Sequence, residues 1–453
     1  MENITETLCD FAMKFRFEDL DQETLDRTRM FIADYYGASF AGYSVNKIFN
    51  RAVLELIKEF GGIEQSHVLF EPQKYPVCAA AFINAVYAHG ADMDDGNKKA
   101  AGHIGSHVMP AVFAMADKLS LTWKEIITAI NVGYEFFNRI AGAAQPSLYR
   151  KGFHSTGIAG AVACAAACAK LTGLDFEGIY NSVSLAAIQS SGLIIIDESG
   201  QECKPINPAN ASKVGVLSAL MAEKGVKSSK NPLESGKGWF HAFSNEINES
   251  ILLEGLGKKF TICESYLKLY PTCRHTHSCI DAVLDIRNHI EGSDVFDSGR
   301  IKKIKVFTYS SAIRSAGQIK YPKTVGEAKF SIYYAIAVAL EKGKFELADL
   351  EPDYANDGIR HLINQIELAV DDTLEDREKN IRGARVKVLL KNGEIFESTV
   401  LVPKGEGEKI LSWEELQKKV ISCAEGVVST DRVLRLVDDC KTVSFEDNYI
   451  PFF

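Results

Sequence analysis

The pattern of apolar residues changes near residue 262, and this change limits the folds that the chain can adopt. Before it, apolar side chains recur at helical spacing, as in the stripe formed by Ile4, Leu8 and Phe11. After it, residues 301–309 alternate apolar and polar side chains and are rich in β-branched residues, which predicts a strand. We therefore expect a helical part joined to a part that contains a β-sheet.

Two further strands are predicted at residues 384–390 and 395–402. The Asn392-Gly393 pair between them is a strong signal for a hairpin turn. Residues 325–341 precede the hairpin and are predicted to form one long apolar helix. Together with the first strand, these segments predict a small α+β domain.

The first part of the chain carries helix signals with identifiable ends. Asp21 is expected to cap a helix that holds residues 24–36, and Gly37 or Gly42 is expected to end it. Residues 147–172 are a loop followed by a helix rich in alanine and glycine. Since small side chains let helices approach closely, we expect this helix at the centre of the core.

The end of the chain returns to an amphipathic helical pattern at residues 412–445, which are expected to pack back on the helical domain. A chain of 453 residues is long for one domain, and two or three are expected. The predicted fold class is mainly α, with a large all-helical domain and a smaller α+β domain.

Composition excludes several classes of partner. The formal net charge of −9 argues against a nucleic-acid-binding protein, because neutralising phosphates needs a basic face. No apolar run reaches membrane-spanning length, and the N-terminal residues lack a hydrophobic signal region. Ten scattered cysteines without a CxxC pair indicate free thiols, so we expect a cytoplasmic protein.

The densest group of functional side chains lies at residues 270–277. Cys273, Arg274, His275 and His277 fall within five residues, and Lys268 precedes them. These groups can bind an anion or move a proton. Cys273 beside His275 could also indicate a thiol protease, but no further signature of that class accompanies them.

A second group is acidic. Asp92, Asp94 and Asp95 follow the apolar helix that starts at Pro76. One interpretation is a divalent-metal site, although no second acidic cluster faces it in the sequence. Another is a solvated acidic turn. A third is that Asp92 orients a neighbouring cation or imidazole.

Histidines form a third group. His103 and His107 are four residues apart, but Gly105 lies between them and the HExxH motif is absent. His103 could therefore be a metal ligand, a loop acid or base, or a structural residue. His154 precedes the small-residue helix, where it could contact an anion or act only as a cap partner of that helix.

Several cations occur in loops between apolar elements. Lys98 follows the acidic group, and Lys204 lies in residues 201–208, where two prolines predict a loop. In an acidic protein, cations placed in this way suggest a pocket for a small polycarboxylate. Because no glycine-rich dinucleotide fingerprint, Walker loop or GxSxG elbow is present, redox-cofactor and phosphoryl-transfer chemistry are disfavoured.

Five segments together resemble the MmgE/PrpD family, and they occur in the family's order. They are AHGADMDDG with GHIGSHVMPA, GFHSTGIAGA, KPINPANASKVG, LKLYPTCRHTHSCIDA and VGEAKFSIYYAIAVAL. Members of this family include 2-methylcitrate dehydratases, cis-aconitate decarboxylases and an iminodisuccinate epimerase. The resemblance implies a helical domain of residues 1–264 and 404–453 and an α+β lid domain of residues 265–403. It also implies a homodimer, an active site between domain and lid, and no metal or organic cofactor.

Carried over residue by residue, the resemblance places Asp92, His103, His154, Lys204 and Lys268 in the active site. The sequence also departs from the decarboxylases at two positions. Gly96 stands where they have threonine, and Cys273 stands where they have a catalytic histidine. These departures argue against decarboxylation.

The shared chemistry of the family is proton transfer at a carbon next to a carboxylate. Such a reaction needs cations to stabilise the enediolate and a base with a pKa near neutrality. We expect Lys204, Lys268 and Arg274 to hold substrate carboxylates, while His103 and His154 act as the acid and base. Asp92 would set the charge or orientation of a neighbour, and the further substrate-binding candidates are Lys98, His275 and His277.

Dehydration of a citrate or 2-methylcitrate type of acid is the favoured reaction, because it is the broader role among relatives. Epimerisation of the iminodisuccinate type and decarboxylation of the cis-aconitate type are alternatives. A non-catalytic polycarboxylate-binding dimer and a metal-dependent helical enzyme centred on residues 92–95 are hypotheses from other classes.

Overall fold

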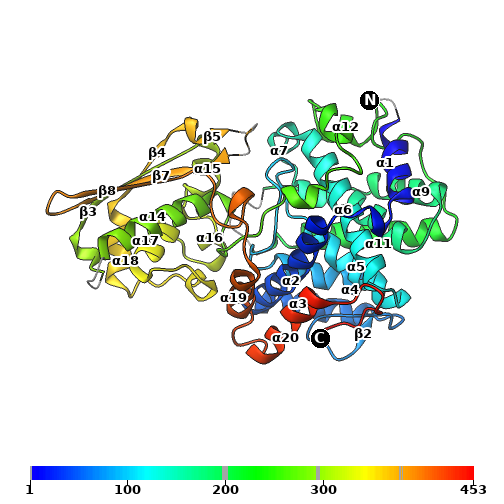
Figure 1. Cartoon of the computed structure of the whole chain (residues 1–453), viewed down its shortest axis with the longest axis horizontal. Coiled ribbons are helices and arrows are strands. Elements are labelled where there is room, and N and C mark those ends of the chain that lie inside the picture. The colour runs from blue at the N-terminus through cyan, green and yellow to red at the C-terminus, as the bar shows by residue number, and fades with distance from the viewer. Residues whose placement is uncertain (1–2, 196–201, 292–295, 377–378, 380, 453) are drawn as a thin grey trace.

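The computed structural model describes residues 3–195, 202–291, 296–376, 379 and 381–452. Helices gather on one side of the molecule, and a four-stranded sheet with its own helices lies on the other (Figure 1). The fold is mainly α with a smaller α+β part, as the sequence predicts.

The helical part contains most of the long helices. They are α1 (Ile4–Lys14), α2 (Gln22–Val45), α3 (Lys47–Phe60), α4 (Val77–His89), α5 (Gly105–Leu119), α6 (Trp123–Ala144), α7 (Ser147–Arg150), α8 (Ser155–Leu171), α9 (Phe176–Ala187), α11 (Ile206–Glu223), α12 (Trp239–Phe243) and α13 (Glu249–Leu253). Two short strands, β1 (Ser66–His67) and β2 (Lys74–Tyr75), pair antiparallel beside them.

Helix α8 is the centre of this part, as its small side chains predict. It packs against α11, α6, α9 and α5, and nearly all of its residues are buried. Gly215 of α11 faces Cys164 of α8, and a Cβ built on Gly215 would lie 2.2 Å from the Cys164 Cβ. The contact between these two helices therefore depends on glycine at position 215.

Helix α2 begins as predicted but does not end at either expected glycine. The Asp21 side chain accepts a hydrogen bond from the Thr24 backbone N–H, which confirms the cap. The prediction that Gly37 or Gly42 ends the helix is wrong, because α2 continues to Val45. A Cβ built on Gly42 would lie 1.9 Å from the Tyr87 carbonyl oxygen, so this glycine permits a close helix crossing.

Residues 412–445 form two helices, α19 (Trp413–Cys423) and α20 (Thr430–Thr442), and both pack against α2. This confirms that the end of the chain packs on the helical part (Figure 1). Lys419 of α19 makes a buried ion pair with Asp34 of α2 and donates a hydrogen bond to the Met93 carbonyl oxygen. The C-terminal helices thus support the loop that carries the acidic residues.

The α+β part holds most of the remaining elements. They are η3 (Arg274–Thr276), α14 (His277–Glu291), η4 (Ser298–Arg300), β3 (Ile301–Thr308), α15 (Ser310–Ala316), α16 (Val325–Ala328), α17 (Ile332–Lys342), η5 (Leu347–Leu350), α18 (Asp357–Gln365), β4 (Ile366–Val370), η6 (Asp372–Leu374), β5 (Glu375–Asp376), β6 (Ile381–Arg382), β7 (Ala384–Leu390) and β8 (Ile395–Val400). The short turns η1 (Phe17–Asp19) and η2 (Thr261–Glu264) instead pack on α6 of the helical part. The three predicted strands are all present, whereas β4 was not predicted.

The main sheet has the strand order β4-β3-β7-β8. Strand β4 pairs parallel with β3, and the other two pairs are antiparallel. The Asn392-Gly393 hairpin is confirmed, and Gly393 has a φ of 93°, which favours glycine. Because α14 packs on β7 and β8 while α18 packs on β3, the helices form a layer on the sheet.

The prediction of one long helix at residues 325–341 is wrong. Helix α16 ends at Ala328 and α17 starts at Ile332. The Ser331 hydroxyl accepts a hydrogen bond from the Tyr334 backbone N–H and so caps a new helix. The break leaves Lys329 and Phe330 outside both helices.

The loop predicted at residues 201–208 is also shorter than expected. Gln201 lies outside the described residues, and α11 already begins at Ile206. Pro208 fits there because the first turn of a helix leaves its N–H groups unpaired.

Buried apolar residues form two large clusters, one in each part. Leu267 belongs to the first cluster and Tyr270 to the second, so the chain crosses between the parts at this point. The chain crosses back next to this point, because the Leu267 backbone N–H donates to the Gly405 carbonyl oxygen. The domain limits 264 and 404 themselves stay a prediction. In the part of the chain that the structure describes, no helix combines the length and apolarity needed to cross a bilayer.

Candidate active site

A cavity of about 650 Å³ is lined by residues of both parts of the molecule. Most of the candidate residues line it, namely Asp92, Lys98, His103, His154, Lys204, Lys268, Arg274 and His275. His277 is not among the lining residues. The fold therefore brings together side chains that lie as far apart in the sequence as Asp92 and Arg274.

The loop after α4 is held in an unusual backbone conformation. Gly90 meets Gly42 of α2 so closely that a Cβ on Gly90 would lie 2.7 Å from the Gly42 Cα. The Gly90 carbonyl oxygen accepts a hydrogen bond from Lys329 Nζ at 2.7 Å. Asp92 then adopts a φ of 55°, in the left-handed region. These constraints direct the Asp92 side chain toward the cavity.

Asp92 makes ion pairs with two lysines. Lys204 Nζ lies 2.7 Å from Asp92 Oδ1, and Lys268 Nζ lies 2.9 Å from Asp92 Oδ2. Burial alone would raise the pKa of this carboxyl, but the two ammonium groups outweigh it and hold the pKa well below its usual range. Asp92 is therefore a fixed anion that orients both lysines, in agreement with the third interpretation of the acidic group.

Asp94 and Asp95 are also buried, so the interpretation of a solvated acidic turn is wrong. Asp94 Oδ2 lies 2.8 Å from His89 Nδ1. Asp95 accepts hydrogen bonds from the Gly105 backbone N–H and from the Tyr134 hydroxyl, both at 2.7 Å. Burial and the neighbouring Asp94 raise the pKa of Asp95 to about 8.

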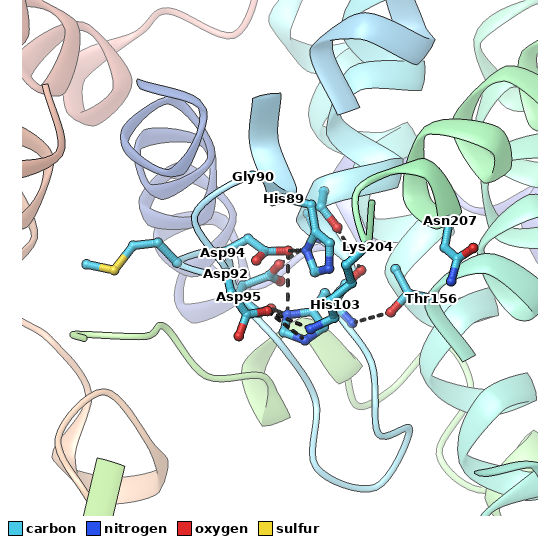
Figure 2. Close-up of polar contacts among 12 residues, drawn as sticks. His89, Gly90, Asp92, Asp94, Asp95, His103, Thr156, Lys204 and Asn207 are labelled. Carbon is cyan, nitrogen blue, oxygen red and sulfur yellow. Dashed lines mark hydrogen bonds and ion pairs between the residues drawn. The ribbon is translucent and has the colours of Figure 1, made fainter. Parts of the chain in front are cut away.

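His103 lies between the acidic loop and helix α8 (Figure 2). Its backbone N–H donates to Thr156 Oγ1, and its Nδ1 lies 3.0 Å from the Asp95 carbonyl oxygen. Burial is the largest influence on its imidazole and lowers the pKa well below 6.5, although Asp94 opposes this change. The ring is therefore neutral at pH 7.

His154 immediately precedes α8 but does not cap it through its side chain, so the interpretation of a mere cap partner is wrong. Its Nδ1 lies 3.0 Å from Asn207 Nδ2, at the start of α11. Burial and the positive charge of Lys204 lower the pKa of His154 well below 6.5. His103 just before α5 and His154 just before α8 thus both reach the cavity, although helices α5, α6 and α7 separate them in the sequence.

His107 does not join His103 in a metal-binding face. It lies in α5 with its ring against Phe137, and in the described part of the chain neither of its ring nitrogens has a hydrogen-bond partner. Burial lowers the pKa of His107 to about 3. The residue is a neutral part of the core.

Within the described residues, one group of side chains has metal-ligand spacing. His89, Asp92, Asp94 and His103 each offer an atom, and these atoms lie within 4.8 Å of one another. Both carboxylate oxygens of Asp92, however, already face a lysine ammonium group. A cation would have to displace or overcome these two positive charges, so the arrangement fits a metal ion poorly.

Arg274 presents free hydrogen-bond donors in the cavity. Its Nε donates to the Glu406 carboxylate, which also pairs with Lys98 at 2.6 Å. Its Nη1 and Nη2 are buried and have no hydrogen-bond partner among the residues that the structure describes. Since a buried guanidinium is normally satisfied, these donors point to an anionic ligand.

The remaining residues of the 270–277 cluster divide between cavity and core. His275 lines the cavity, and its Nδ1 lies 2.6 Å from the Tyr309 hydroxyl. Cys273 also lines the cavity. His277 instead is buried, with Nε2 3.3 Å from the Thr272 carbonyl oxygen. The structure thus gives His277 a contact within the protein rather than a position on the cavity wall.

Sequence reasoning missed three residues that hold this site together. Lys329 contacts the loop at Gly90, Glu406 joins Arg274 to Lys98, and Asn207 contacts His154. Burial lowers the pKa of Lys329 to about 8. The only sequence signal for Asn207 and Lys329 is that both lie within the segments that resemble the family.

Two sequence profiles decide the relationship of this chain to known proteins. The MmgE/PrpD N-terminal domain matches residues 6–250, and the MmgE/PrpD C-terminal domain matches residues 270–442. The chain belongs to the MmgE/PrpD family. Because the two profiles together span residues 6–250 and 270–442, the family relationship extends over nearly the whole chain.

Several characterised MmgE/PrpD relatives are similar to this chain at low identity. The cis-aconitate decarboxylase of Homo sapiens is 27% identical over an alignment of 462 residues, gaps included. The alignment covers 98% of this chain and 92% of that protein. The cis-aconitate decarboxylase of Aspergillus terreus (strain NIH 2624 / FGSC A1156) is 24% identical, over 96% and 92% of the two chains. The 2-methylcitrate dehydratase of Escherichia coli (strain K12) is 24% identical, over 63% and 59%.

Proposed function

We propose that the protein is a lyase that acts on a small di- or tricarboxylate by removing a proton next to a carboxylate. The MmgE/PrpD relatives named as lyases support the reaction class. The observation that carries the proposal is the convergence of Asp92, two lysines and two neutral histidines on one cavity.

The cations in this cavity suit a substrate with more than one carboxylate. The free Nη1 and Nη2 donors of Arg274 match the geometry of a carboxylate, which can accept two parallel hydrogen bonds. Lys204 and Lys268 lie at Asp92, where they can stabilise the negative charge that develops on a second carboxylate. Asp92 keeps their charges balanced while the cavity is empty of substrate.

The histidines supply the group that moves the proton. Both His103 and His154 line the cavity, and both are neutral at pH 7 because burial lowers their pKa values. A neutral imidazole can accept a proton from carbon. No step of this proposal needs a metal or an organic cofactor, and a homodimer is part of the proposal through the family resemblance.

Dehydration of a citrate or 2-methylcitrate type of acid is the first choice of reaction. In that case a hydroxyl leaves from the carbon beside the one that lost its proton. If the proton returns to the opposite face instead, the reaction is an epimerisation of the iminodisuccinate type. The same groups serve both reactions, so the substrate determines the outcome.

A direct experiment offers the purified protein citrate, 2-methylcitrate, cis-aconitate and iminodisuccinate separately in D₂O and follows each mixture by proton NMR. We expect loss of the signal of the exchangeable proton with at least one acid, together with product signals. His103→Gln should abolish this exchange, whereas His107→Gln, a change outside the cavity, should keep it. Thermal stabilisation by an acid without exchange or turnover would instead favour a non-catalytic binding protein.

Decarboxylation of cis-aconitate is a second candidate, because the decarboxylase relatives match almost the entire chain. Against it, Cys273 lines the cavity where those enzymes are expected to have a histidine. We expect Cys273→His to gain or increase release of CO₂ from cis-aconitate, with Cys273→Ser as the matched control. Rapid CO₂ release by the unmodified protein would make decarboxylation the main activity.

A further inference from the structure

The two imidazoles of the cavity have opposite hydrogen-bond partners at Nδ1. The Nδ1 of His103 faces the Asp95 carbonyl oxygen, which can only accept, so this nitrogen carries the proton. The Nδ1 of His154 faces the Asn207 amide nitrogen, which donates, so this nitrogen carries the lone pair. The Nε2 atoms therefore have the opposite protonation. The Nε2 of His103 carries a lone pair, and the Nε2 of His154 carries a proton.

A second contact fixes the orientation of the Asn207 amide. Asn207 Nδ2 also lies 3.0 Å from the Leu193 carbonyl oxygen. Turning the amide over would place its oxygen against the Leu193 carbonyl oxygen, where two acceptors repel and this hydrogen bond is lost. The segment that holds Leu193 is anchored beside His154, because the His154 backbone N–H donates to the Gly192 carbonyl oxygen. Asn207 therefore donates to His154.

The surroundings of the two rings also differ in how well they can accommodate an additional proton. Asp94 Oδ2 lies 3.5 Å from His103 Nδ1, and Asp92 Oδ1 lies 3.9 Å from His103 Nε2. Both carboxylates would stabilise a protonated His103, whereas Lys204 and Lys268 oppose it. A protonated His154 would lie near Lys204 and would need to donate from Nδ1 toward the Asn207 N–H, which cannot accept. The clash at Nδ1 therefore makes His103 the better placed of the two to hold an additional proton.

We propose that Asn207 is a positioning residue that keeps His154 as a neutral hydrogen-bond donor at Nε2 and leaves His103 Nε2 as the base. This inference rests on the proposed function. In the first step, the C–H bond breaks, a bond from hydrogen to His103 Nε2 forms, and the electron pair passes into the adjacent carboxylate. His154 donates a hydrogen bond to the negatively charged oxygen and keeps its own proton.

The dehydration is completed by His103 alone. The β C–O bond breaks as the electron pair returns to form the C=C bond. The protonated His103 gives its proton to the departing oxygen, so that water leaves and the imidazole is neutral again. His154 acts throughout as an electrophile, which is a known role for a neutral histidine.

The tautomers can be measured without any substrate. Protein labelled with ¹⁵N-histidine gives two-dimensional spectra in which protonated and unprotonated ring nitrogens have separate shifts. We expect His154 to be protonated at Nε2 and His103 at Nδ1, with signals assigned from His154→Gln and His103→Gln. A proton on Nδ1 of His154 in the unmodified protein would overturn the inference.

Two matched substitutions on α11 test the role of Asn207. Asn207→Asp replaces the donor by an acceptor, so the proton of His154 should move to Nδ1. Turnover should then fall about 10²- to 10³-fold, as when one donor to a developing oxyanion is lost. Asn210→Asp adds the same charge one turn further, where the Asn210 amide donates to the Ser191 hydroxyl. This control should leave tautomers unchanged and turnover within about two-fold.

The pH dependence gives a second readout. In Asn207→Asp the new carboxylate should raise the pKa of His154 and add an ionisation to the profile of kcat/KM. Asn207→Leu removes the donor without adding a charge and should populate both tautomers of His154. If Asn207→Asp changes neither tautomer nor pH profile, Asn207 has no positioning role. If the tautomers are as expected but no acid is turned over, the proposed function fails while the tautomer assignment stands.

Discussion

Lys268 Nζ contacts Asp92 twice, at 2.6 Å from its carbonyl oxygen and at 2.9 Å from its Oδ2. The lysine side chain is completely buried, although it is charged. One residue thus holds both the backbone and the carboxylate of Asp92. Lys204 contacts the carboxylate, at 2.7 Å from Asp92 Oδ1, and lines the cavity.

This difference predicts unequal effects of two similar substitutions. Lys268→Met removes one of the two charges that balance Asp92 and should lower the free energy of unfolding by about 3–5 kcal/mol, as when one partner of a buried ion pair is removed. Lys204→Met should cost less, because Lys204 is less deeply buried and Lys268 still holds both the carboxylate and the carbonyl oxygen of Asp92. Urea denaturation of both variants measures the difference. Equal losses would mean that the two lysines share the charge of Asp92 evenly.

The raised pKa of Asp95 predicts that the stability of the protein depends on pH. Its pKa in the folded protein is raised to about 8, whereas an unfolded aspartate has a pKa near 4. The folded protein therefore binds one more proton than the unfolded chain between these values. The contribution of Asp95 to stability is full below pH 4 and is lost progressively as the pH rises to 8, by about 1.4 kcal/mol per unit.

Asp95→Asn tests this dependence, because asparagine resembles the protonated acid and can keep contacts to Gly105 and Tyr134. The variant should gain stability relative to the unmodified protein as the pH rises from 5 to 8. Asp10→Asn, which removes the exposed partner of Lys14 on α1, is the control and should show no such trend. Denaturation curves at several pH values give the comparison, and a constant difference would contradict a neutral Asp95.

Arg274 predicts an effect on substrate binding. Arg274→Lys keeps the positive charge but loses the paired Nη1 and Nη2 donors. Losing hydrogen bonds from a charged group costs about 1.5–3 kcal/mol, so kcat/KM should fall roughly ten- to hundred-fold. Arg385 lies on strand β7 and pairs with Asp371, outside the cavity lining. Arg385→Lys should therefore leave kcat/KM unchanged. An unchanged value for Arg274→Lys would show that its free donors do not bind substrate.

The sequence allowed the general architecture and most of the cavity to be predicted. Hairpin and strand signals are local, and they were confirmed. The family segments carry Asp92, His103, His154, Lys204 and Lys268, and the fold places all of them on one cavity. Loop cations in an acidic protein were a useful guide, because such charges are retained inside only when they have partners.

The features that sequence reasoning missed depend on contacts between distant segments. Three neighbouring aspartates normally indicate a solvated turn, yet helices α2, α6 and α19 cover this loop and bury it. Gly42 looks like the end of a helix, but it serves a close crossing with Gly90. The apolar pattern of residues 325–341 continues through the break, so only the cap by Ser331 reveals it.

Within the 270–277 cluster, His277 and His275 predict opposite results for the same substitution. His277 lies outside the cavity lining, so His277→Gln should keep kcat/KM within about two-fold and lower stability by about 1 kcal/mol through its contact with the Thr272 carbonyl oxygen. His275 lines the cavity, so His275→Gln should reduce kcat/KM. Stability should change little, because the glutamine amide can still form a hydrogen bond with the Tyr309 hydroxyl. Each variant controls for the other in steady-state kinetics and urea denaturation. A large loss of kcat/KM in His277→Gln at unchanged stability would mean that this histidine reaches the substrate after all.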